Sequence, residues 1–218
     1  MKKIIDKPLY FAVFLALAGL ARGQQSFSIQ IIADNDFAVF GGTSNSVNDL
    51  IYQNDVSWPD QLNNLSTITF SLQPGDTTFY LLGMGGGGDE NISGTVNGVD
   101  ITTIDISMSS DLSSYLSGYS DGPVADGTYD ASLSDVQTAF PDLTWTTNLV
   151  VTYGGVAAQS PTGRGFDFPS STAHLFEFGA TDVGVTPTAP EPSTCLLLAS
   201  AGVMLAVGRF RKSPPPCT

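Results

Sequence analysis

The stretch that decides the fold is residues 66–84, which read STITFSLQPGDTTFYLLGM. On both sides of Pro74-Gly75, large apolar residues recur among small polar ones, a pattern typical of strands with a buried face. Pro followed by Gly favours a type II turn, because Pro presets φ and Gly accepts a positive φ. We therefore predict strands over 66–72 and 77–84, joined as a hairpin at this turn.

Similar short apolar runs, separated by Gly, Pro, Asn and Asp, continue outward in both directions. They predict strands over 27–33, 37–40, 50–52, 92–96, 99–108, 148–153 and 173–178. Asn97-Gly98 supplies the two positive-φ residues that a tight hairpin needs. Because nine short strands are too many for one open sheet of this size, we predict an all-β, two-sheet antiparallel β-sandwich, jelly-roll-like in arrangement.

Helix is scarce in this pattern. We predict two helical turns over 110–119, and a second short helix where Ser134 and Gln137 form a capping box. Neither segment is long enough to form a layer of its own. The sandwich is therefore expected to consist of sheets alone.

The amino terminus has the features of a secretory signal. A basic start is followed by an apolar stretch over 9–20, and Ala21-Arg22-Gly23 places small residues where a signal peptidase reads. We predict a signal peptide over residues 1–23 and a mature chain that starts at Gln24.

The carboxyl terminus carries a second address. It reads Pro190-Glu191-Pro192-Ser193-Thr194, then an apolar run over 195–208, then a basic cluster over 209–212. As a helix the run would span roughly 21 Å, short of the roughly 30 Å of a bilayer core. This order resembles the PEP-CTERM sorting signal of Gram-negative bacteria. The resemblance implies recognition by an exosortase, a membrane cysteine transpeptidase that removes the tail, so that the segment contacts the membrane only transiently.

Between the two signals we expect a β-sandwich domain over 24–179 and a Thr/Pro stalk over 180–190, with the sorting signal over 191–218. Residues 24–190 contain 21 − 2 = 19 acids and one base, Arg164, a formal charge of 1 − 19 = −18. Such a surface repels phosphate backbones and anionic lipid, which excludes nucleic acid and membrane surfaces as partners. Cys195 and Cys217 both lie in the tail, so the domain is expected to fold without a disulfide.

A second resemblance involves the domain itself. Asp34-Asn35-Asp36, then Trp58, then the strand pair around Pro74-Gly75 are similar to the jelly-roll modules of the galactose-binding-like class, as is Asp126-Gly127-Thr128-Tyr129-Asp130. This resemblance implies a β-sandwich that binds carbohydrate on its loops or on one face.

Two acidic clusters are candidates for a structural calcium site. They are Asp34 with Asp36, and Asp89 with Glu90. Calcium takes six to eight oxygen ligands and tolerates irregular loops. The alternative is that these acids are solvated turn residues, which arise easily in a chain this acidic.

The candidate ligand-binding residues are three aromatics and a base. Trp58, Trp145 and Tyr129 offer flat faces on which a sugar ring stacks, or else they pack in the core. We expect both tryptophans to lie on loops. Arg164, the only base of the mature domain, either forms an internal ion pair or binds a ligand.

Catalysis has little support in the sequence. His174 is the only histidine, and there is no G-x-S-x-G elbow. We therefore predict an exported, non-catalytic protein of the cell surface or extracellular matrix of a Gram-negative bacterium, acting as a carbohydrate-binding module. The alternatives are a structural or adhesion component of the biofilm matrix, and a glycosidase that uses two carboxylates.

Overall fold

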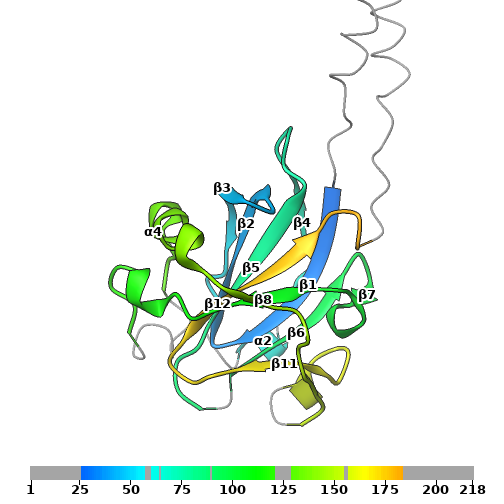
Figure 1. Cartoon of the computed structure of the whole chain (residues 1–218). Coiled ribbons are helices and arrows are strands. Elements are labelled where there is room, and N and C mark those ends of the chain that lie inside the picture. Colours follow the sequence, from blue (N-terminus) through cyan, green and yellow to red (C-terminus); the bar gives the residue numbers. More distant parts are fainter. Residues whose placement is uncertain are drawn as a thin grey trace, which may run out of the picture. The chain divides into compact units, whose positions relative to one another are not determined.

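The computed structural model describes residues 26–56, 60–63, 65–88, 90–120, 129–154 and 157–183. These residues belong to one compact unit, Gln25–Thr186. Two antiparallel sheets dominate it, which confirms the all-β sandwich (Figure 1). The predicted signal peptide, most of the stalk, the sorting signal, Trp58 and Asp89 lie outside the described residues.

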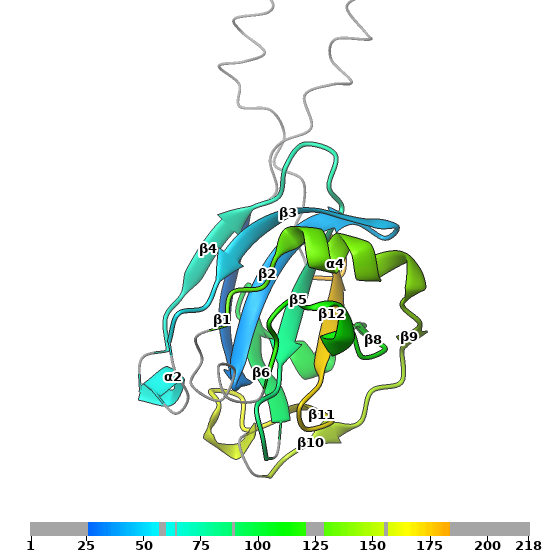
Figure 2. The same ribbon diagram turned by 90° about the vertical axis from the view of Figure 1, so that its left-hand side faces the viewer.

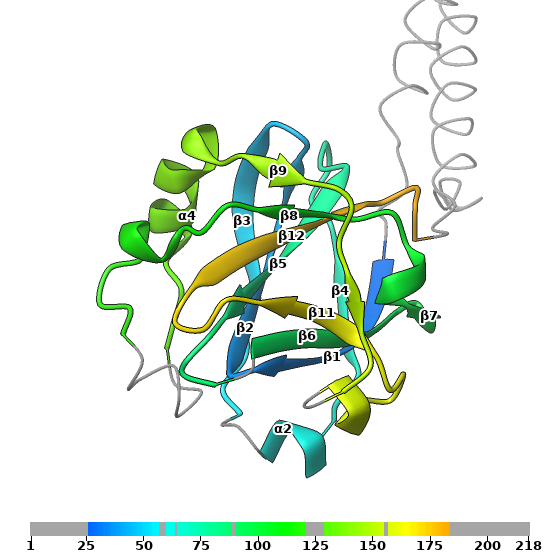
Figure 3. The ribbon, with the colours of Figure 1, turned by 60° about the horizontal axis from the view of Figure 1, so that its bottom comes forward.

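The first sheet, sheet A, has the strand order β10-β11-β6-β1-β4, with β7 paired to β6 (Figure 3). Its strands are β1 (Ser26–Asp34), β4 (Ile68–Ser71), β6 (Glu90–Val96), β7 (Val99–Asp100), β10 (Val151–Thr152) and β11 (Gly165–Phe168). The long strand β1 pairs with β4 through its first half and with β6 through its second half. It therefore joins the two halves of the sheet.

The second sheet, sheet B, has the order β3-β2-β5-β12-β8-β9. Its strands are β2 (Asp36–Thr43), β3 (Ser46–Gln53), β5 (Thr78–Met84), β8 (Ser107–Ser109), β9 (Trp145–Thr146) and β12 (Ala173–Gly179). Every residue of the central strand β5 is buried. Because successive side chains of a strand point to opposite faces, covering one face of the sheet would bury only every second residue.

The two sheets enclose an aromatic core. Phe79 of β5 stacks on Phe178 of β12 with ring centroids 4.8 Å apart, and it also contacts Phe27 of β1 at 5.1 Å. All three side chains are almost completely buried. Burial of this apolar surface is the main force that holds the sheets together.

A second core covers the outer face of sheet B, and it corrects our expectation that no helix would form a layer. The helix α4 (Leu133–Ala139) and the 3-10 turn η2 (Ser113–Tyr115) lie on this face (Figure 2). Leu112, Leu116 and Val136 pack there against outward side chains of β2, β5 and β12. Sheet B is therefore buried on both sides, which explains the continuous apolar run of β5.

The two predicted turns have different outcomes. Asn97 and Gly98 adopt φ values of 51° and 77°, and β6 pairs with β7 across them, so this hairpin is confirmed. At Pro74-Gly75 the turn forms, with Gly75 at φ 107° and the N–H of Asp76 donating to Gln73 O at 3.0 Å. However, β4 pairs with β1 while β5 pairs with β2 and β12. The hairpin prediction is wrong, and this connection crosses between the sheets.

The predicted strand 99–108 is also wrong, because it is broken into three pieces. Asp100 accepts a hydrogen bond from the backbone N–H of Thr102 and begins the 3-10 turn η1 (Ile101–Thr103). The chain then leaves sheet A and enters β8 of sheet B. Strands β9 and β11 were not predicted, because each is too short to show a pattern.

Helical boundaries differ as well. Of the predicted turns over 110–119 only η2 forms, and α4 follows Ser132 without a side-chain cap. Gln137 does not close a capping box; its amide donates to Val47 O at 2.9 Å instead. The remaining short elements are α2 (Asp60–Asn63), η3 (Phe140–Asp142) and η4 (Ala157–Gln159).

The sandwich extends slightly past the predicted domain end. Ala180 and Val183 are buried against the inner core, and the N–H of Ala180 donates to Thr77 O at 2.9 Å. The first residues that we assigned to the stalk therefore pack on the sandwich.

Candidate functional site

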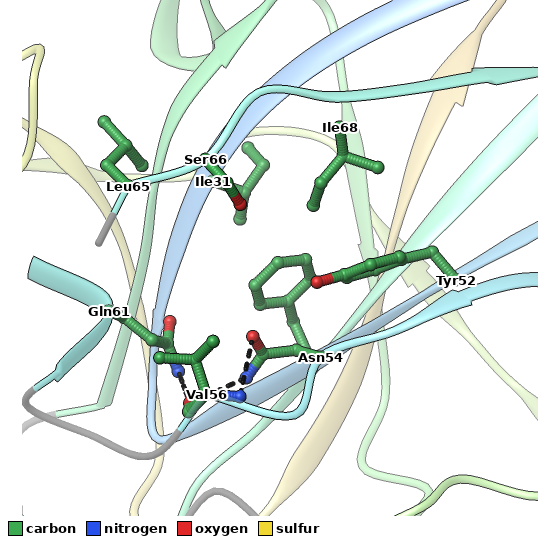
Figure 4. Close-up of a pocket in the computed structure, with 9 residues that line it drawn as sticks. Ile31, Tyr52, Asn54, Val56, Gln61, Leu65, Ser66 and Ile68 are labelled. Atoms are coloured by element: carbon green, nitrogen blue, oxygen red, sulfur yellow. Dashed lines mark hydrogen bonds between the residues drawn. The ribbon is translucent and has the colours of Figure 1, made fainter.

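The described residues form two recesses that we considered as sites. The first is a slot at the edges of the two sheets, between β3 and β4, with α2 at its end (Figure 4). It is lined by Ile31, Phe37, Tyr52, Asn54, Val56, Gln61, Leu65, Ser66 and Ile68. The space open to the centre of a water molecule is only about 10 Å³, which is room for about one water.

The amide groups of this slot are already used by the protein. Asn54 Nδ2 donates to Asp36 Oδ1 at 2.8 Å and to Val56 O at 3.0 Å. Gln61 donates to Asn35 O at 2.7 Å and accepts from the N–H of Ala33 at 3.1 Å. These bonds tie α2 and the end of β3 to the β1–β2 connection, so we interpret the slot as structural.

The second recess is a wider groove between residues 102–106 and residues 147–151. The space open to the centre of a water molecule is about 270 Å³ in this groove. Its polar lining consists of Thr102, Asp105, Thr147 and Asn148, and its apolar lining consists of Ile104, Ile106, Leu149, Val151 and Phe166. A recess lined by hydroxyl, amide and carboxylate groups together with apolar side chains is suited to a small polar ligand.

Arg164 lies beside this groove but does not line it. Its Nε donates to Asp100 Oδ2 at 2.5 Å, and Asp100 Oδ1 accepts from both the backbone and the hydroxyl of Thr102. Burial alone would raise the pKa of Asp100, but the hydrogen bonds from Thr102 and Arg164 outweigh it and hold the pKa below its ordinary value. The structure thus places Arg164 in an internal ion pair, one of the two roles that we predicted.

The two described aromatic candidates are packing residues. Trp145 lies on β9, not on a loop, and its ring centroid is 5.9 Å from Phe140 and 6.0 Å from Tyr80. Tyr129 is buried, lies 5.6 Å from Tyr119 and donates its hydroxyl proton to a backbone oxygen. Both residues belong to the outer core of sheet B. Tyr153, by contrast, is 67% exposed.

The described acidic candidates are all buried. Asp36 is fully buried, and its Oδ1 accepts from the N–H of Phe37 at 2.7 Å as well as from Asn54. Burial raises the pKa of Asp36 to about 7, although hydrogen bonds from Asn54 and from the backbone of Phe37 and Tyr129 oppose the shift. Asp34 and Glu90 are also buried and lie on β1 and β6.

No metal centre is formed by the part of the chain that the structure describes, in the sense that no three His, Cys, Asp or Glu residues gather there. Asp89, the fourth predicted ligand, lies outside that part. Calcium binding therefore stays a prediction.

His174 is held in the structure by two hydrogen bonds. Its Nδ1 lies 2.8 Å from Ser109 O and its Nε2 lies 2.9 Å from Thr172 Oγ1. The ring is buried against Phe168 with centroids 5.8 Å apart. This arrangement ties β12 to β8 and gives the imidazole a structural role.

The groove could not be predicted from the sequence, because its two walls come from distant parts of the chain. One wall was predicted to be a continuous strand, although Asp100 followed two residues later by Thr102 is a turn-initiating pattern that could have indicated the break. The residues 147–150 between β9 and β10 carry no pattern that points to a site.

The comparison with known proteins concerns the carboxyl terminus. Residues 188–212 match the family described as the PEP-CTERM protein-sorting motif. The chain carries a PEP-CTERM sorting motif. This confirms our prediction for residues 190–194, and it marks an exported protein that is sorted to the cell surface and processed by an exosortase. No curated protein and no solved structure matches the chain, so the galactose-binding-like resemblance stays a prediction.

None of the helices in the described ranges is long and apolar enough to cross a membrane.

Proposed function

We propose that this surface-sorted β-sandwich is a non-catalytic module that binds an extracellular carbohydrate in the groove between residues 102–106 and 147–151. The observation that carries the proposal is the groove itself, because hydroxyl, amide and carboxylate groups line it beside apolar side chains. Sugars are bound by hydrogen bonds to such groups and by contact of their apolar face with apolar side chains.

The charges in and beside the groove limit the class of carbohydrate that it can bind. Arg164 is engaged by Asp100, and Asp105 adds a negative charge to the groove. An anionic glycan would therefore meet repulsion, whereas a neutral one would not. Neutral polysaccharide of the cell's own matrix, or of a surface that the cell adheres to, fits these requirements.

The test is binding of the exported protein to a panel of neutral and anionic oligosaccharides, followed by calorimetry on any that bind. Asn148→Ala removes an exposed amide from the groove, and Asn45→Ala removes one from the β2–β3 turn as a matched control. We expect Asn148→Ala to weaken binding about tenfold, since a lost hydrogen bond costs roughly 1–1.5 kcal/mol, and Asn45→Ala to leave it unchanged. Equal affinity for the two variants would contradict the proposed site.

A structural role in the matrix is the second candidate, and a separate observation favours it. The two described aromatic candidates, Trp145 and Tyr129, make packing contacts with Phe140 and Tyr119 in the outer core, and neither lines the groove. Binding to no member of the panel, together with calcium-dependent self-association of the protein, would support the structural role. Turnover of a chromogenic glycoside would support the glycosidase alternative.

A further inference from the structure

Two carboxylates meet at the end of sheet B, away from the groove. Asp49 lies on β3, and Asp76 lies on the crossover between β4 and β5. A Cβ atom on Gly41 would lie 2.5 Å from Asp49 Oδ1 and 3.1 Å from Asp76 Oδ2, so both oxygens approach the same point of β2. The absence of a side chain at Gly41 makes this approach possible.

These two oxygens have no conventional hydrogen-bond partner. Asp49 Oδ1 and Asp76 Oδ2 are shielded from solvent, and neither forms a hydrogen bond with the rest of the protein. The other oxygen of Asp76 accepts from Asn48 Nδ2 at 2.6 Å, which fixes the orientation of that carboxylate. Two facing carboxylate oxygens without a donor repel each other unless a proton or a cation lies between them.

Among the residues that the structure describes, Arg164 is the one base, and it lies elsewhere. Burial raises the pKa of Asp49, and so does the charge of Asp76. At this point β2 contributes Gly41 and β5 contributes its register partner Phe79, neither of which titrates. Asp182, in the turn after β12, lies over Gly179 instead. Arg164 is engaged at Asp100.

We propose that Asp49 and Asp76 share one proton, which joins β3 to the β4–β5 crossover in mildly acidic surroundings and is released to solvent as the pH rises. In the acidic form, the protonated carboxyl donates to the other carboxylate. In the alkaline form two negative charges face each other and weaken the contact between the crossover and β3, which then depends on the bond from Asn48 to Asp76.

The state of this pair also affects the residues that follow β12. The N–H of Thr77, next to Asp76, donates to Gly42 O at 2.8 Å, and Thr77 O accepts from the N–H of Ala180 at 2.9 Å. A weaker contact between the crossover and β3 loosens the segment after β12, which leads toward the sorting motif. The Asp49–Asp76 pair therefore makes the attachment of the segment after β12 depend on pH.

The experiment is a pH titration of the full exported protein by NMR, following the side-chain carboxyl carbons of Asp49 and Asp76 and the backbone amides of Thr77 and Ala180. We expect one carboxyl step at least about one pH unit above that of the exposed Asp55, a tenfold higher proton affinity. The two amides should follow the same step. Titration of both acids together with Asp55 would overturn the proposal.

Two variants and the addition of calcium test whether a proton, and not a cation, lies between the two carboxylates. Asp49→Asn supplies a permanent donor to Asp76, so the raised step should disappear and the amides should keep their acidic positions at pH 8. Asp55→Asn, which removes the same charge elsewhere, should leave the step intact. If calcium at pH 8 and matched ionic strength moves the wild-type amides to their acidic positions, the pair is a cation site and the proposal is wrong. If the variants do not fold, the wild-type titration still decides.

Discussion

The two faces of sheet B are buried by different means. Toward sheet A, its strands present phenylalanines: Phe79 stacks on Phe178, and it contacts the tilted ring of Phe27 of sheet A. On the outer face, the same strands are covered by α4, η2 and the residues around Tyr129, whose segments pair little with the sheet. The inner core thus lies between the strands of the two sheets. The outer core lies between sheet B and a covering segment, which consists of α4, η2 and the residues around Tyr129.

The covering segment is fastened by side-chain amides at the edge of the sheet. Gln53 of β3 donates to Tyr129 O at 2.9 Å and accepts from the N–H of Ala131 at 3.0 Å, while Gln137 of α4 donates to Val47 O. Individual bonds of this kind contribute only about 1 kcal/mol each. The difference teaches that the inner core sets the stability of the domain, and the outer core can yield locally.

The largest effect should come from the inner core. Phe79→Ala removes a fully buried ring with three aromatic neighbours, and such truncations cost about 3–5 kcal/mol. Urea denaturation measures the change, with the exposed Thr69→Ala of β4 as control. A loss below that of the outer-core variant described below would break the comparison.

Asp36 should make the stability of the outer side depend on pH. Because burial raises its pKa to about 7, the folded state holds a proton that the unfolded chain releases at about pH 4. This contribution is therefore fully present below about pH 4 and is lost as the pH rises to about 7.

Between pH 5 and pH 8 we expect a loss of roughly 2–3 kcal/mol from this group. Asp36→Asn should remove most of that dependence, as measured by denaturant midpoints across the pH range. Asp55→Asn controls for the general relief of self-repulsion in an acidic domain. A variant with the same slope as the wild type would show that Asp36 is ionised throughout.

Leu116→Ala tests the outer core directly. Leu116 belongs to the covering segment and is buried between it and sheet B, but that segment is free to relax around a cavity. We expect a loss of about 2 kcal/mol, the low end for a buried leucine. Hydrogen exchange should increase over residues 110–143 while the amides of β5 stay protected, and uniform exchange would mean that the two cores unfold together.

The smallest effect should come from the ion pair on sheet A. Arg164→Gln removes the partner of Asp100, but the guanidinium is 35% exposed, and pairs open to water on one side contribute little because water screens them. We expect a denaturation midpoint that cannot be distinguished from that of the wild type. A clear destabilisation would show that the loop before β11 supports the sandwich as strongly as the outer core does.

The features that could be predicted from the sequence are those that depend on residues next to one another in the chain. Alternation placed the long strands, since side chains of successive strand residues point to opposite faces. Asn97-Gly98 specified a hairpin through backbone conformations that few other residues adopt. The sorting motif is read as a linear segment, and for that reason it was recognisable without any fold.

Only the tertiary structure decided which distant segments meet. Pro74-Gly75 determines a turn but not the partner of each strand, so a predicted hairpin became a crossover between sheets. Tyr129 is buried in the outer core and Trp145 packs against that core, because a segment without strong local pattern covers sheet B. The groove and the Asp49–Asp76 pair likewise join residues far apart in the chain, and no local propensity encodes such contacts.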